Sequence, residues 1–122
     1  MEFFIRQGAS DPILKMRMID DGKNDKSQFN DLVENAEITF DMIDIKTGNP
    51  VIYGAECDLV NRVKKGHYIN DEYYITYRFT EEQTTDSGRF EGKITIHFND
   101  GNGNNTTKLI LPIREKLYIN II

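Results

Sequence analysis

Alternation of apolar and polar side chains runs through most of this chain and limits the folds open to it. In AEITFDM, the apolar residues Ala36, Ile38, Phe40 and Met42 alternate with polar ones. A period of two residues places such side chains on opposite faces of a β-strand, whereas an α-helix requires a period of 3.6. This stretch therefore predicts a strand with one face in a core and the other toward solvent.

The same period recurs along the chain between segments that favour turns. It is present in residues 2–7, 13–19, 51–63, 73–79 and 90–98, and two apolar stretches, 108–113 and 116–122, finish the chain. Gly, Pro and Asn punctuate the intervals, and these residues are typical of turns. Seven or eight short strands without a long helix indicate an all-β, two-sheet antiparallel sandwich. No repeat or linker divides the chain, so we expect a single domain over residues 1–122.

One turn, DSGRFEG, resembles the start of a late core strand in immunoglobulin domains, which often reads Asp-x-Gly-x-Tyr-x-Cys. Asp86 and Gly88 match this pattern, but Phe90 lacks the tyrosine hydroxyl and Gly92 replaces the cysteine. The chain also contains no tryptophan. We therefore expect an immunoglobulin-like sandwich that lies outside the immunoglobulin superfamily proper.

The order of features resembles that of small immunoglobulin-like domains of phage virions, found at the N-terminus of baseplate upper proteins and in related head and tail proteins. DLVENAEITFDM, residues 31–42, is similar to the DLTGATVTFNM segment of these domains. A Gly-Asn turn, an alternating strand, the Tyr73-x-Ile75-x-Tyr77 strand and a final apolar strand follow in the same order.

This resemblance implies a non-enzymatic structural component of a bacteriophage virion, acting in the tail or baseplate or as a head accessory or decoration subunit. Its partners would be other phage structural proteins of the coat, neck or tail. Such a protein is made in the host bacterial cytoplasm and located in the virion. Because no long C-terminal region follows, as it does in a baseplate upper protein, we expect a stand-alone accessory or decoration subunit.

Composition argues against several other classes of partner. The net charge is −5 and the pI is about 5.0, a poor match for a nucleic-acid backbone. The apolar runs are far shorter than the ~20 residues of a membrane span, and the start of the chain lacks the features of a signal peptide. The single cysteine, Cys57, cannot form an internal disulfide and fits a reducing compartment. Cys57 shares a face with Ala55 and Leu59, so we expect a buried, unreactive thiol.

Residues that could carry catalysis or bind metal are few. His97 is expected on the outward face of a strand, and His67 follows a glycine without a carboxylate–histidine pattern. DGNGNN begins like a calcium loop at Asp100, but Asn105 stands at the required glycine position and Leu111 at the required glutamate position. We therefore expect no catalytic residues, no cofactor and no metal site.

The tyrosines leave an alternative function open, a module that binds a glycan of the host surface. Tyr73 and Tyr77 are expected to face inward with Ile75, whereas Tyr74 faces outward. A concave strip of exposed aromatic residues would favour the glycan module. Apolar loops and an edge strand that dock on neighbours would favour the structural subunit.

The surfaces expected to contact partners are the loops and the N-terminal strand. Residues 20–35 are too long for a simple connection, and residues 99–107 are polar and rich in glycine. Phe3 and Phe4 are adjacent and point to opposite faces of a strand, so one enters the core and the other stays exposed. The candidate partner-binding residues are Phe3, Phe4, Phe29, Leu32, Asn102 and Asn104. A homo-oligomer of this chain is a further alternative.

Overall fold

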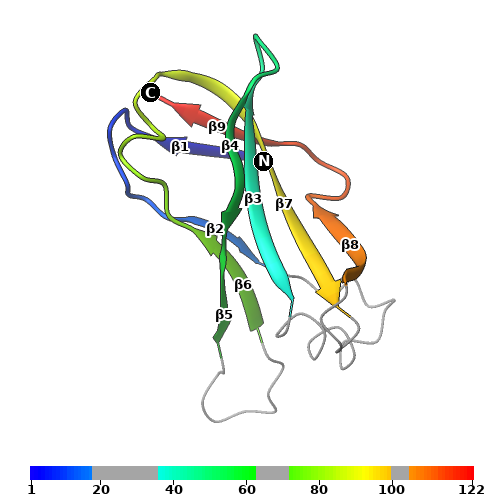
Figure 1. The fold of residues 1–122 in the computed structure, drawn as a ribbon. Coiled ribbons are helices and arrows are strands. Elements are labelled where there is room, and N and C mark those ends of the chain that lie inside the picture. Colours follow the sequence, from blue (N-terminus) through cyan, green and yellow to red (C-terminus); the bar gives the residue numbers. More distant parts are fainter. Residues whose placement is uncertain (18–35, 63–71, 100–104) are drawn as a thin grey trace.

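The chain folds into two facing β-sheets (Figure 1). The computed structural model describes residues 1–17, 36–62, 72–99 and 105–122, and within these ranges it contains nine strands and no helix. The all-β, two-sheet sandwich predicted from the alternation is therefore confirmed.

The larger sheet has six strands and the smaller sheet has three. In the larger sheet the order is β1 (Glu2–Ile5), β9 (Leu117–Ile121), β7 (Gly88–Asn99), β3 (Glu37–Asp44) and β4 (Pro50–Glu56), and β8 (Asn105–Leu111) pairs with the second half of β7. In the smaller sheet the order is β2 (Leu14–Arg17), β6 (Glu72–Tyr77) and β5 (Asp58–Arg62). The pairs are antiparallel as expected, except that β1 runs parallel to β9.

Residues 51–63, expected as one strand, are divided between the two sheets. β4 pairs with β3 as far as Glu56, and β5 pairs with β6 from Asp58 onward. Between them the Cys57 N–H donates to the Ile38 carbonyl at 2.9 Å, and at this residue the chain leaves the larger sheet. The described residues thus form nine strands where seven or eight were expected, because the alternation continues unbroken through the crossing.

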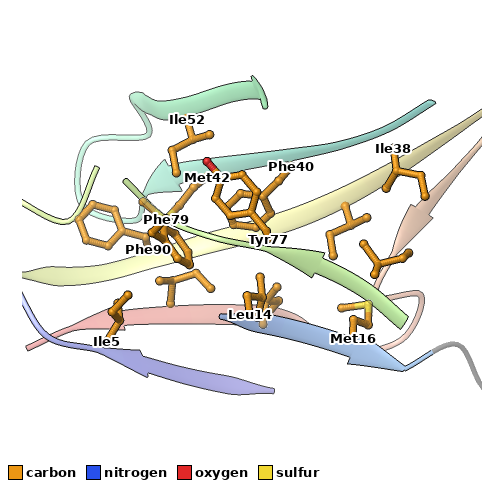
Figure 2. Packing of buried hydrophobic residues seen from close by; sticks show 14 of the residues in the cluster. Ile5, Leu14, Met16, Ile38, Phe40, Met42, Ile52, Tyr77, Phe79 and Phe90 are labelled. Atoms are coloured by element: carbon orange, nitrogen blue, oxygen red, sulfur yellow. The ribbon is translucent and has the colours of Figure 1, made fainter. Parts of the chain in front are cut away.

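Apolar side chains from both sheets fill the space between them (Figure 2). The ring centroids of Phe40 on β3 and Tyr77 on β6 lie 4.6 Å apart, and Phe79 meets both rings edge-on at 5.7 and 5.1 Å. Offset and edge-on contacts of this kind stabilise aromatic pairs beyond the area that they bury. The alternation places Phe40, Ile75, Tyr77, Phe90 and Ile94 on the inward faces of their strands, and all five are buried.

The outer face of β3 is less open to solvent than its sequence suggests. Thr39 was expected to face outward, and it does, but it is buried because β3 lies between β4 and β7. Its cross-strand neighbour Thr95 is buried as well, and the Thr39 hydroxyl lies 3.4 Å from Nε2 of His97. Polar side chains on a central strand are thus covered by those of its neighbours.

The turn between β6 and β7 is tied to the segment that follows β1. Thr84 is fully buried, and its Oγ1 lies 2.9 Å from the Ala9 carbonyl oxygen and 3.2 Å from that of Glu81. The Gly8 N–H donates to the Thr84 carbonyl at 2.9 Å. Gly88 then begins β7 with φ +150°, a conformation that glycine adopts most readily, as the DSG pattern predicted.

Thr84→Val should lower the free energy of unfolding by about 1–2 kcal/mol, because it keeps the side-chain shape but removes the donor to the carbonyl of half-buried Ala9. Urea unfolding followed by circular dichroism measures the change. Thr85→Val is the matched control, since the Thr85 side chain makes similar bonds to Glu82 at an exposed position. Equal losses in the two variants would contradict the anchoring role of Thr84.

Candidate interaction surface

The N-terminal strand β1 separates its two phenylalanines as the sequence predicted. Phe3 pairs with Ile119 of β9 and stacks on Phe79 at a centroid distance of 5.8 Å, so its ring packs against the core. Phe4 points to the outer face of the larger sheet and is 55% exposed. The structure therefore leaves a large aromatic side chain in solvent at the end of a sheet.

The backbone of β1 has a free edge beside Phe4. The carbonyls of Met1 and Ile5 accept hydrogen bonds from β9 and its C-terminal neighbour Ile122, each at 2.9 Å, and the Gln7 N–H donates to Ile122 at 3.0 Å. Alternate residues of a strand direct their N–H and C=O groups to opposite sides. Glu2, Phe4 and Arg6, the residue that follows β1, therefore direct theirs away from β9, where the described residues provide no neighbouring strand. Of these groups, the Arg6 carbonyl accepts the Ala9 N–H at 3.1 Å.

Side chains around Phe4 hold the outer face of this edge in place. Arg89 of β7 places Nη2 2.7 and 3.2 Å from the two carboxylate oxygens of Glu2, and its guanidinium lies 3.9 Å from the ring centroid of Tyr118. Nδ2 of Asn120 donates to the Phe3 carbonyl at 3.3 Å. The side chains of Glu2, Arg89 and Asn120 thus have partners within the chain, while the Phe4 ring is only half covered.

The opposite edge of the larger sheet is less suited to pairing with another strand. β4 begins at Pro50 and is bulged at Gly54, which has φ +64° and donates its N–H to Oδ1 of Asp41 at 2.8 Å. The register of β4 against β3 is also shifted at two places. Prolines and bulges at an edge discourage the addition of a further strand. Of the two ends of the β1-β9-β7-β3-β4 path, β1 is therefore the regular one.

In the part of the chain that the structure describes, the exposed aromatic residues do not form the strip that would favour a glycan module. Tyr53 on β4 is 89% exposed, but three strands separate it from Phe4 on β1. Tyr74, expected to face outward, is half-buried, with the Lys15 ammonium 5.8 Å from its ring centroid. Tyr77 faces the core as predicted, and the side chain of Tyr73 lies outside the described residues.

The other four candidate partner-binding residues lie outside the described residues. Phe29 and Leu32 belong to residues 18–35, and Asn102 and Asn104 to residues 100–104. The strand ends that flank both segments lie at one end of the sandwich (Figure 1). Of the six candidates, the structure describes two: Phe3 is half-buried and packs against the core, and Phe4 lies on the surface.

No protein family, curated protein or solved structure matches this chain. Its function must then be inferred from its own surface and chemistry.

Groups of titratable side chains offer little chemistry in the described ranges. None of these ranges brings together three or more His, Cys, Asp or Glu side chains that could hold a metal ion. His97 is half-buried on the outer face beside Thr39, and His67 lies outside the described residues. As for membranes, the described ranges hold no helix with the length and apolar character of a membrane span.

Cys57 is half-buried, not buried as expected. It does share a face with Ala55 and Leu59, which are also half-buried, but it lies where the chain crosses between the sheets and is not covered from every side. The pKa of the Cys57 thiol is raised from 9.0 to about 12, chiefly by desolvation and to a smaller extent by the nearby carboxylates of Asp58 and Asp41. The thiol is therefore held in its neutral, unreactive form.

Cys57 should react with a maleimide or iodoacetamide probe far more slowly in the native protein than in urea. A pKa raised by about three units lowers the thiolate fraction at pH 8 on the order of a thousandfold. The native labelling rate should keep rising with pH beyond 9, where the rate of an ordinary thiol levels off. Native labelling at pH 8 as fast as in urea would contradict this description of the site.

Proposed function

We propose that this chain is a non-enzymatic structural component of a bacteriophage virion, which acts through protein–protein contacts made at the edge of β1. The observation that carries the proposal is the exposed Phe4 ring beside the outward-directed backbone groups of Glu2 and Phe4. An open strand edge of this kind is a template for a strand of another chain, and an aromatic side chain beside it adds apolar area to bury. The partners are other structural proteins of the coat, neck or tail.

The phage assignment is supported by the order of sequence features, from DLVENAEITFDM through the final apolar strand. It also draws on the strand order. In immunoglobulin-like sandwiches one sheet carries strands B, E and D and the other carries C, F and G. Here β2, β6 and β5 occupy the first set of positions, and β3, β7 and β9 the second. This correspondence supports an immunoglobulin-like sandwich of the type found in virion accessory domains.

The test is to introduce Phe4→Lys into the gene of the encoding phage and to quantify the chain in purified particles by mass spectrometry. We expect wild-type chain in the particles and at least a tenfold loss of the variant, because the lysine replaces the apolar contact with a strongly hydrated charge.

Val51→Lys is the matched control. Val51 lies on the opposite edge strand β4 and is 43% exposed, so the same charge is added to the same sheet without touching β1. This variant should be incorporated like the wild type. Equal incorporation of both variants, or particles that lack the wild-type chain, would overturn the proposal. Glycan binding by the isolated wild type together with its absence from particles would favour the glycan module instead.

A further inference from the structure

We propose that the strand that covers the β1 edge belongs to a second copy of this chain, and that the two copies pair antiparallel about a two-fold axis at Phe4. The inference rests on the proposed function in one respect, that the β1 edge is a site of assembly contact. It adds the identity of the partner and the register of the pair. Two-fold dimers of identical chains use the same patch on both copies, so the patch must complement itself.

The sequence of β1 meets this requirement. In an antiparallel pair centred on Phe4, each Phe4 faces the Phe4 of the second copy, and Glu2 faces Arg6 of the second copy. The two-fold axis repeats the Glu2–Arg6 pairing, so each copy contributes one carboxylate and one guanidinium. Opposite charges directly across an antiparallel pair are favourable, and like charges are unfavourable.

The backbone groups fit the same register. The N–H and C=O groups of Glu2 and Phe4 and the N–H of Arg6 point toward the free edge. The Arg6 carbonyl accepts the Ala9 N–H at 3.1 Å, and a carbonyl oxygen can accept a second hydrogen bond. In the proposed register these residues face one another, as the hydrogen-bonded pairs of an antiparallel ladder must. A slip of one residue would place Glu2, Phe4 and Arg6 opposite residues whose backbone N–H and C=O groups already bond to β9. A slip of two residues would no longer place Glu2 opposite Arg6. The proposed register is the one that satisfies both conditions.

The side-chain environment shows that Arg6 is available for this role. Arg6 is exposed, and it makes no ion pair with any residue of the described ranges. Glu2 is held on the outer face by Arg89, and its carboxylate remains exposed. Pairing would give Arg6 a carboxylate partner and place the two exposed Phe4 rings against each other, which removes apolar surface from water.

The pair is small, because β1 has four residues and each copy adds only Arg6 beyond it to the proposed ladder. Interfaces below about 1,200 Å² are typical of weak or transient association, so sedimentation velocity should cover roughly 10 µM to 1 mM protein. We expect the mass to rise with concentration from 14.2 kDa toward twice that value. A mass of 14.2 kDa over the whole range would overturn the inference.

Charge exchange tests the register. In a dimer of the Arg6→Glu variant, carboxylates face each other at both of the positions where Glu2 meets residue 6 of the second copy. In a dimer of the Glu2→Arg variant, guanidinium groups face each other at both positions. Each change should therefore raise the dimer Kd at least about tenfold. An equimolar mixture of the two variants restores opposite charges at both positions, and a heterodimer should form with a Kd near the wild-type value. Failure of the mixture to associate, or unchanged dimerisation of either variant, would overturn the register.

Two further variants separate pairing from folding. Arg114→Glu makes the same charge change at an exposed position outside β1 and should leave the dimer unchanged. Phe4→Pro removes the outward-directed N–H but none of the bonds to β9, and proline is tolerated on edge strands with this orientation. It should abolish the dimer while the monomer still melts cooperatively. A Phe4→Pro protein that dimerises like the wild type would contradict strand pairing.

The failure of this inference can be told apart from the failure of the proposed function. A wild type that stays monomeric, while Phe4→Lys is still excluded from particles, would overturn self-pairing and leave another structural protein as the occupant of the edge. A dimer that never enters particles would uphold self-pairing and overturn the virion assignment.

Discussion

Phe90→Ala should lower the free energy of unfolding by about 3–5 kcal/mol, the usual cost of deleting a large aromatic side chain from a core. Phe90 is 4% exposed and sits on β7 between Asp44 of β3 and Ile119 of β9. Because strands on both sides and the opposite sheet hold its surroundings, the cavity can collapse only in part. Urea unfolding of the purified variant measures the loss.

Phe4→Ala is the matched control, since it makes the same chemical change at a position that is 55% exposed. Its free energy of unfolding should change by less than about 1 kcal/mol when measured at a protein concentration low enough for the monomer. A loss below about 1 kcal/mol for Phe90→Ala would show that the side chain points outward and that the register of β7 is wrong.

Gly92→Ala should lower the free energy of unfolding by about 1–3 kcal/mol, because a methyl group at this position has no room. A Cβ on Gly92 would lie 2.9 and 3.1 Å from two ring carbons of Phe40 and 3.3 Å from Cδ2 of Leu117. The backbone of Gly92 is not in the left-handed region, so the cost is one of packing and not of conformation. Thermal and urea unfolding both report it.

A double-mutant cycle isolates the cause. In a Phe40→Leu background the ring that the new methyl group would strike is gone, so Gly92→Ala should cost clearly less than it does in the wild type. Since contacting residues couple by about 0.5–3 kcal/mol, the difference is measurable. The same cost in both backgrounds would mean that the close approach to Phe40 is not what excludes a side chain here.

Much of the sandwich could be predicted from the sequence because its strands have one buried and one exposed face. The alternation assigns Ile38, Phe40 and Met42 to the core, and all three are buried. It also separates Phe3 from Phe4 correctly. Where a strand is central, the alternation still gives the face but not the exposure, as the burial of Thr39 on the outer face shows.

Features that depend on pairing could not be predicted in this way. A change of sheet at Cys57 leaves the period of two intact, so residues 51–63 have the pattern of one strand although they form β4 and β5. For the same reason the sequence did not reveal that Cys57 lies at a crossing and is only half-buried. The parallel pairing of β1 with β9 joins the two ends of the chain, which no local pattern encodes.

Two signals were present in the sequence without being used. An isolated glycine within an alternating strand suggests a close approach by another group, and Gly92 between Phe90 and Ile94 is such a case. In EFFIR, a carboxylate and a guanidinium flank an aromatic residue at equal spacing, which is the condition for antiparallel self-pairing. The second signal acquires meaning only once the structure places these residues on an edge strand.

The central claim is that another chain covers the edge of β1 in an assembled virion. A reconstruction of the particle at a resolution that separates strands tests this most directly, because it locates the chain and shows what lies beside it. We expect residues 2–6 of each copy to form a continuous ladder with a strand of a neighbour, with a two-fold axis at Phe4 where that neighbour is a second copy. A particle that lacks the chain, or one in which the β1 edge faces solvent in every copy, would contradict the account.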